Sequence, residues 1–157
     1  MTNKKAIFID TGNLYYCISK KFNARRLDYA KFLETTGPYD VKHAYVAQMN
    51  DQVDRFIKYL ENLDFNVHVK SPRKRKVNSQ FIWEIDWKIE ITLNVIDFLD
   101  ACEDGQVTLA TNDVGFIPLI DDLLDQKVSI SIIAAGVPNV FSEKTRTIEI
   151  PESCLCE

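Results

Sequence analysis

The sequence lacks the features that mark several protein classes. No apolar run in its 157 residues is long enough to cross a bilayer, and the first residues lead into a strand-like segment instead of a signal peptide. Its four cysteines have neither zinc-finger spacing nor the spacing of a disulfide framework. No glycine-rich phosphate loop, internal repeat or low-complexity tract is present. These absences argue against membrane-spanning, disulfide-rich and repeat proteins, and they predict a cytoplasmic protein with reduced thiols.

The chain also lacks an excess of positive charge. Its net charge of −4 at pH 7 argues against a protein that coats nucleic acid through its overall charge. Positive charge is nevertheless clustered within one short segment, which contains Lys70, Arg73, Lys74, Arg75 and Lys76. Such a cluster is able to bind a phosphate backbone, although basic runs are also common in solvated loops. The cluster alone favours neither interpretation.

Short apolar runs alternate with helix-period segments about five times, the pattern of βαβ units. Strands are predicted over 6–10, 42–48, 65–70, 106–111 and 128–134. Helices are predicted over 14–20, over 27–33, after a cap at Asp51, over 81–102 and from about residue 116. We therefore predict a single domain over residues 1–150 with a three-layer α/β/α sandwich fold. Its mainly parallel, five-stranded, Rossmann-like sheet has the order 3-2-1-4-5, and residues 151–157 form a flexible tail.

The segment 81–102 is predicted to be a long, largely buried helix because apolar residues cover much of its circumference. Four polar residues recur along one of its faces: Asp86, Glu90, Asn94 and Asp97. A buried carboxylate is costly unless it is paired, protonated or bound to a cation. This cost favours a cleft for the polar row, with a solvated edge of the sheet as the alternative.

Two aspartates stand where predicted strands end, far apart in the chain. If both strands lie in one parallel sheet, Asp10 and Asp113 meet in the crevice where open α/β sheets bind ligands. Two such carboxylates suit a divalent metal. Each aspartate could instead cap the helix that follows it, and Asn13 could satisfy backbone groups of the turn. His43 and His68 lack metal-ligand spacing and are predicted to be structural or surface groups.

Three blocks resemble those of NYN domains, the PIN-like nuclease group with a Rossmann-like sheet, whose active members are metal-dependent ribonucleases. FIDTGNLY at 8–15 resembles F-I-D-x-x-N-L-Y, and WKIEITLNVI at 87–96 resembles a block with the form W/V-D-V-x-L-x-x-D. LATNDVGFIPL at 109–119 resembles L-x-S-G-D-S-D-F-x-P-L. The resemblance implies the same fold, an RNA substrate and Mg²⁺ or Mn²⁺ as cofactor.

Three of the five acidic positions of these blocks differ in this chain. The residues that match are Asp10, Asn13 and Asp113. Lys88 and Asn94 stand where aspartates are usual, and Gly115 replaces the second aspartate of the third block. The loss of three carboxylates disfavours a site with two metal ions most, because a second cation needs more negative charge.

The leading hypothesis is a metal-dependent ribonuclease with weakened activity, in which one Mg²⁺ or Mn²⁺ activates water and offsets charge on the scissile phosphate. Its metal ligands are Asp10, Asp113 and Glu90, and Asn94 completes the catalytic set. Its substrate contacts are Asn13, Lys88, Lys70, Arg73, Lys74, Arg75 and Lys76. The expected partner is single-stranded RNA, on whose bases Tyr15 and Tyr16 could stack. Pairing of two copies as a homodimer stays open.

Two alternatives belong to other classes. In the first, the Lys88 ammonium points into the crevice and replaces the cation, which leaves a phosphate-binding pocket without turnover in a catalytically inactive RNA-binding or partner-recruiting module. On an ideal helix, however, Lys88 faces away from the row of Asp86, Glu90 and Asn94, a position that favours the metal. The second alternative is a binder of small phosphates or nucleotides.

Overall fold

The structure, a computed structural model, describes residues 3–156. Six strands form a sheet of order β4-β3-β1-β7-β8-β9, and all neighbours in it are parallel. The strands are β1 (Lys5–Asp10), β3 (Val41–Ala47), β4 (Asn66–Lys70), β7 (Gln106–Ala110), β8 (Ser129–Ala134) and β9 (Arg146–Glu149). The five predicted strands lie in the predicted order. The sequence-based prediction missed β9, which extends the sheet beyond β8.

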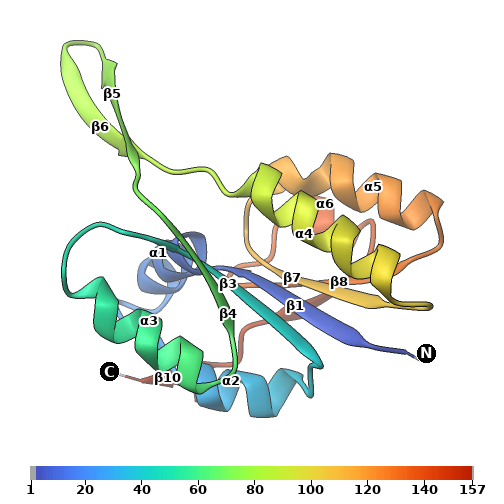
Figure 1. The fold of residues 1–157 in the computed structure, drawn as a ribbon. Helices are drawn as coiled ribbons and strands as arrows, with labels where there is room; N and C mark the ends of the chain where they lie inside the picture. The colour runs from blue at the N-terminus through green and yellow to red at the C-terminus, as the bar shows by residue number, and fades with distance from the viewer. Residues whose placement is uncertain (1–2, 157) are drawn as a thin grey trace.

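Helices cover both faces of this sheet (Figure 1). On one face lie α4 (Lys88–Ala101), α5 (Ile117–Asp125) and the short α6 (Asn139–Ser142), and on the other lie α1 (Thr11–Lys21), α2 (Tyr29–Thr36) and α3 (Val53–Asn62). Successive side chains of a strand point to opposite faces. Phe8 therefore packs in the α4 core with Phe116, and Ile9 packs in the α1 core with Leu14. The predicted three-layer α/β/α architecture is confirmed.

Side-chain caps begin two of the helices. The Asp10 carboxylate accepts a hydrogen bond from the Asn13 amide at 3.3 Å, and the Asp28 carboxylate accepts one from the Lys31 amide at 3.1 Å. The predicted cap at Asp51 is wrong, because α3 begins after Gln52 without a side-chain cap. Asp10 thus ends β1 and begins α1, which places its carboxylate at the carboxyl edge of the sheet.

The prediction of a continuous helix over 81–102 is wrong at its N-terminal end. Gln80–Glu84 forms strand β6, which pairs antiparallel with β5 (Arg73–Val77). The aromatic and β-branched residues of β6 suit a strand, and the two turn residues between β5 and β6 both have positive φ, as in the turns that favour hairpins. Asp86 therefore precedes α4 instead of continuing a polar face along it.

The β5–β6 hairpin stands away from the body of the molecule (Figure 1). Every residue of both strands is exposed to solvent. Its two ends connect β4 to α4, so the hairpin leaves the body at the carboxyl edge of the sheet. Most of the basic cluster predicted from the sequence thus lies on a strand and not in a loop.

The C-terminal segment is packed against the body. A 3-10 turn at Glu152–Cys154 leads into β10 (Leu155–Cys156), which pairs antiparallel with β2 (Arg26–Leu27). Cys154 and Leu155 are buried, so the flexible tail predicted over 151–157 is not what the structure shows up to Cys156. Met1, Thr2 and Glu157, which also fall within the predicted ranges, lie outside the described residues.

A cavity of about 750 Å³ lies beside this segment, between α1, β2 and α3. Its lining is mostly apolar and includes Tyr15, Tyr29, Phe56 and Cys156. Among residues 3–156, no helix combines the length and the apolarity that crossing a bilayer requires.

Candidate functional site

The candidate site lies at the carboxyl edge of two neighbouring strands. Asp10 ends β1, and Asp113 follows the end of β7, which pairs with β1 in parallel. Both side chains are half-buried. The carboxylates also interact electrostatically, since Asp113 is among the groups that raise the pKa of Asp10. The topology thus brings these two predicted site residues together.

Each of these carboxylates also serves as a cap. Asp10 accepts the hydrogen bond from the Asn13 amide described above, and Asp113 accepts one from the Gly115 amide at 2.8 Å. The capping roles considered from the sequence therefore coexist with the shared crevice. Part of the acceptor capacity of each carboxylate is already used by the backbone.

Burial raises the pKa of Asp10 to about 6, from an ordinary value of 3.8. The negative charges of Asp113 and Asp86 raise this pKa further, while the Asn13 amide and the Lys88 ammonium lower it. Asp10 consequently gains and loses its proton close to neutral pH.

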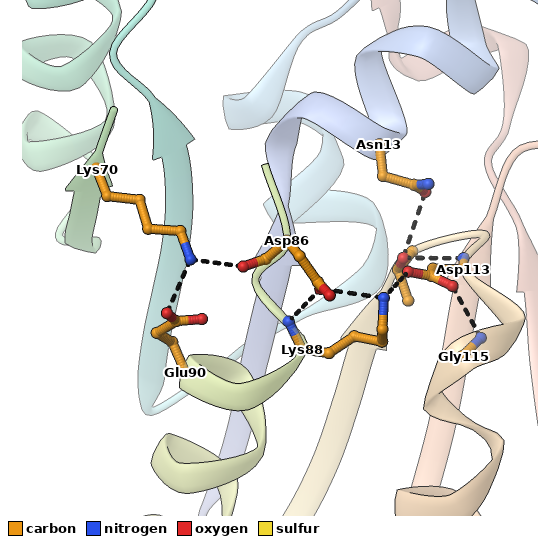
Figure 2. A network of polar contacts seen from close by, with 8 residues as sticks. Asn13, Lys70, Asp86, Lys88, Glu90, Asp113 and Gly115 are labelled. Carbon is orange, nitrogen blue, oxygen red and sulfur yellow. Dashed lines mark hydrogen bonds and ion pairs between the residues drawn. The ribbon is translucent and has the colours of Figure 1, made fainter. Parts of the chain in front are cut away.

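The ammonium of Lys88 lies between two carboxylates (Figure 2). Its Nζ atom is 3.0 Å from Asp86 and 3.1 Å from Asp113. The Asp86 carboxylate also accepts a hydrogen bond from the Lys88 amide at 2.9 Å, which fixes the start of α4. Although burial acts to lower the pKa of Lys88, the hydrogen bonds that its ammonium donates to both carboxylates raise this pKa, so the ammonium stays charged.

The helical-wheel argument for Lys88 is wrong for Asp86, which precedes α4 and pairs with the Lys88 ammonium, and it is also wrong about the position of the crevice. Glu90 and Asn94 do lie on a different side of α4 from the Lys88 side chain, but the crevice lies on the side of Lys88. The Glu90 carboxylate accepts a hydrogen bond from Lys70 at 2.8 Å, and the Asn94 amide donates to the Tyr45 hydroxyl at 2.8 Å. Neither is brought together with Asp113, as Figure 2 shows for Glu90.

Gly115 provides the space that Lys88 occupies. A Cβ atom added at this position would lie 2.8 Å from Lys88 Cδ and 2.9 Å from a carboxylate oxygen of Asp113. Both distances are shorter than real Cβ contacts. A side chain at position 115 and the observed Lys88 conformation therefore exclude each other, so the two departures from the acidic motif are structurally linked.

Asn13 joins three elements at this edge. Its Oδ1 atom accepts hydrogen bonds from the Asn112 amide at 2.7 Å and from the Thr111 hydroxyl at 3.3 Å. The Asn112 side chain in turn donates to the Ala135 carbonyl at 2.7 Å. Asn13, predicted as a substrate contact, thus ties α1 to the ends of β7 and β8. No sequence pattern indicates a role for Asn112, because that role depends on the adjacency of β7 and β8.

The five residues of the basic cluster, all predicted as substrate contacts, fall into two groups. Lys70, at the base of the hairpin, pairs with Glu90, donates to the Asp86 carbonyl at 2.5 Å and lies 4.4 Å from the Trp87 ring centre. The others lie on β5 and are exposed: Arg73, Lys74, Arg75 and Lys76. Lys70 therefore anchors the hairpin to the body, while the cations of β5 face solvent.

The two histidines lie within a half-buried aromatic stack that includes Tyr45. His43 Nδ1 is 2.9 Å from His68 Nε2, and the rings of His68 and Tyr45 stack with centres 4.7 Å apart. Burial and the neighbouring His68 lower the pKa of His43 to about 4. The arrangement agrees with a structural role for both.

The residues at the crevice do not fit a divalent cation. The Lys88 ammonium already pairs with Asp86 and Asp113. Of the other predicted site residues, Glu90 is bound to Lys70, and Asn94 is bound to Tyr45. Over residues 3–156, no group of three or more histidine, cysteine, aspartate or glutamate side chains could hold a metal ion. A hard cation such as Mg²⁺ needs several oxygen ligands in near-octahedral geometry, and Lys88 supplies a positive charge in their place.

Comparisons with known proteins identify the family and the fold. The NYN domain family model matches residues 4–150, nearly the whole chain. A solved structure, "Crystal structure of a protein of unknown function VPA0982 from Vibrio parahaemolyticus RIMD 2210633", is similar with a TM-score of 0.82 and 21% sequence identity. The similarity covers 98% of this chain and 96% of the Vibrio chain. No curated protein matches the sequence significantly.

Proposed function

Because the chain belongs to the NYN domain family, a family of PIN-like nucleases, we propose that it binds RNA without metal-dependent cleavage. The observation that supports the absence of cleavage is the Lys88 ammonium, which lies 3.0 Å from Asp86 and 3.1 Å from Asp113. Lys88 takes the place of the cation that the resemblance implies. The chain then keeps the fold and the two strand-end aspartates of the family, and uses them to hold a lysine.

Electrostatics supports this replacement. At an effective dielectric constant of about 20, an ammonium and a divalent cation about 4 Å apart repel each other by about 8 kcal/mol. A metal ion could enter only if Lys88 left both of its carboxylate partners. Three residues would then have to rearrange together, and Glu90 and Asn94 would still be engaged elsewhere.

The binding half of the proposal is supported by the cations of β5. They are exposed on a hairpin that leaves the same edge of the sheet as the crevice. The crevice itself contains Asp10, Asp86 and Asp113 with Lys88, so it gives a phosphate no net attraction. We therefore assign the phosphate contacts to the hairpin and a structural role to the crevice.

The direct test is cleavage of single-stranded RNA in Mg²⁺ or Mn²⁺, together with a binding measurement in EDTA. We expect the wild-type protein to bind the RNA in EDTA and to show no metal-dependent cleavage above the level of Asp113→Asn. Cleavage that requires Mn²⁺ and disappears in Asp113→Asn would contradict the proposal and identify a ribonuclease.

A second variant tests the role of Lys88. The double substitution Lys88→Asp/Gly115→Asp removes the ammonium and adds a carboxylate at each of the two positions. The shorter side chain at position 88 leaves room for the new one at position 115. We expect this variant to bind Mn²⁺ at least tenfold more tightly than the wild-type protein in calorimetry. The matched control is Lys58→Asp, which adds negative charge on α3 away from the crevice. Equal Mn²⁺ affinity of wild type and double variant would contradict the replacement of a cation by Lys88.

A further inference from the structure

We infer that the β5–β6 hairpin binds unpaired bases of RNA, with Trp83 and Phe81 as stacking platforms and Lys74 as the adjacent phosphate contact. This inference rests on the proposed function and goes beyond it, because it names the recognition element and residues that no sequence motif indicates.

The hairpin register places aromatic and basic side chains on one face. Lys74 is paired with Trp83 and Lys76 is paired with Phe81 across the ribbon. In an antiparallel pair, directly opposed side chains lie on the same face, and the residues between them lie on the other. One face thus combines two lysines with two rings. We call these four residues, Lys74, Lys76, Phe81 and Trp83, the stacking face.

The opposite face has a different character. Arg75 forms an ion pair with Glu84 at 3.0 Å, and Val77 and Ile82 are its apolar residues. This ion pair satisfies one hairpin cation internally. The stacking face contains no carboxylate, so its positive charge is not neutralised within the hairpin.

Contacts within the stacking face already resemble those made with a nucleotide. The Lys74 ammonium lies 4.3 Å from the centre of the Phe81 ring and 5.9 Å from the centre of the Trp83 ring. A cation held beside a ring can bind the phosphate of a nucleotide whose base stacks on that ring. Phe81 and Trp83 are separated by one residue, so their rings stand about 7 Å apart along the strand, which allows one base on each.

Exposure makes these rings available. Phe81 and Trp83 are each 61% exposed, an unusual state for large aromatic side chains. All ten residues of β5 and β6 are exposed, so the hairpin packs no face against the body. Two of the largest apolar side chains of the chain are therefore held in solvent on a ribbon that contributes nothing to the core.

The charge of the hairpin selects the ligand. Four cations and a single carboxylate lie within 73–84, in a chain whose net charge is −4. A polyanion with flat apolar groups complements both properties, and single-stranded nucleic acid is such a polyanion. Bases in a duplex are already stacked and paired, so rings on the hairpin could not reach their faces.

The experiment measures affinity for a fluorescein-labelled 12-mer of oligouridylate by fluorescence anisotropy in EDTA. The variant Phe81→Ala/Trp83→Ala removes both rings. The matched control, Val77→Ala/Ile82→Ala, removes two exposed apolar side chains from the opposite face of the same hairpin. We expect at least a 30-fold loss of affinity in the first variant and a change of less than threefold in the control. Both variants should keep the wild-type melting temperature, because neither pair packs on the body.

Tryptophan fluorescence provides a readout that a purely electrostatic site would not give. Trp87 is buried, whereas Trp83 is exposed, so stacking of a base should quench Trp83 selectively. We expect quenching by the oligonucleotide in the wild-type protein and none in Trp83→Phe, which should nevertheless retain most of the affinity because phenylalanine still stacks.

Several outcomes would overturn the inference while leaving the proposed function intact. Unchanged RNA affinity in Phe81→Ala/Trp83→Ala would do so, as would equal losses in this variant and the control. Equal binding of a blunt RNA duplex with no effect of ring removal would also exclude stacking on unpaired bases. Binding of polyglutamate as tightly as the RNA would show a general cationic surface for acidic proteins. Absence of any RNA binding by the wild-type protein would instead reject the proposed function itself.

Discussion

At the scale of single residues, the crevice depends on how its charges are balanced. Asp10 has a pKa that is shifted toward neutral pH, because burial and two neighbouring carboxylates raise it to about 6. Lys88 opposes this effect and is itself held charged by Asp86 and Asp113. The ionised form of Asp10 is therefore destabilised in the folded protein, and the Lys88 ammonium offsets part of this effect.

The Asp10 carboxylate should destabilise the folded state above neutral pH. Its folded pKa of about 6 exceeds the ordinary value of 3.8, so the folded state retains the proton longer. The contribution of Asp10 to stability is thus complete below about pH 4 and is lost as pH rises through 6. We compare the change that Asp10→Asn makes in the free energy of unfolding at the two pH values. We expect this change to be more stabilising at pH 8 than at pH 4 by about 2–3 kcal/mol.

Urea unfolding at both pH values checks this prediction. Asp28→Asn is the matched control, because Asp28 caps α2 in the same way that Asp10 caps α1 but lies outside the crevice. A pH-independent effect of Asp10→Asn, or an equal effect of both substitutions, would contradict the electrostatic origin.

Position 115 should be coupled energetically to Lys88. A methyl group at 115 would lie 2.8 Å from Lys88 Cδ, so Gly115→Ala forces the lysine away from its partners. We expect a destabilisation of about 1–3 kcal/mol in the wild-type background and a smaller one in Lys88→Ala, where only the close contact with the Asp113 oxygen remains. A double-mutant cycle by thermal or urea unfolding measures this coupling. Additive effects would show that the two side chains do not share the space.

At the scale of elements, the turn of the hairpin is not fully optimised. Asn78 and Ser79 have φ values of 49° and 67°, which suits asparagine at the first position and glycine at the second. Ser79→Gly should therefore stabilise the hairpin by about 1 kcal/mol. The expected result is slower amide hydrogen exchange in β5 and β6 without a change in the melting temperature of the body. Faster exchange in these strands would contradict the turn assignment.

The elements show which parts of the fold the sequence predicts. The apolar runs of β1, β3, β7 and β8 predict most of the sheet, because strands buried between two helical layers are largely apolar. The alternating segment of β4 also predicts a strand, although none of its residues is fully buried. Strand β9 is shorter, and none of its residues is fully buried. Strand β6 was assigned to the helix because its large side chains resemble a buried helical stripe. Only the structure reveals that they face solvent on a hairpin.

The candidate site was less predictable than the sheet. Sequence order and parallel pairing are enough to bring Asp10 and Asp113 to one edge. The direction of the Lys88 side chain depends on where α4 begins. The sequence predicts a helix that already starts at residue 81, whereas α4 begins at Lys88. A helical wheel drawn from the earlier start could not show that Lys88 points toward the crevice. Pairings such as Lys70 with Glu90 depend on side-chain conformations that no spacing rule contains.

At the scale of the whole molecule, an acidic body carries a basic arm. This separation of charge predicts that RNA affinity depends steeply on salt although the net charge is −4. We expect Lys74→Gln/Lys76→Gln, on the stacking face, to weaken binding and to reduce the slope of log affinity against log salt by about 1.4, the value for two phosphate contacts with a single strand. Anisotropy titrations at several salt concentrations measure the slope. Lys20→Gln/Lys21→Gln on α1 is the control, and an equal change there would contradict a localised arm.

The pairing of β10 with β2 has a practical consequence for these measurements. Cys156 lines the 750 Å³ cavity, so an affinity tag fused to the carboxyl end would begin at the mouth of that cavity. The amino end enters β1 at the opposite edge of the sheet from the hairpin (Figure 1). Immobilising the protein on a sensor chip through its amino end would leave the hairpin pointing into the flow, free to meet oligonucleotides.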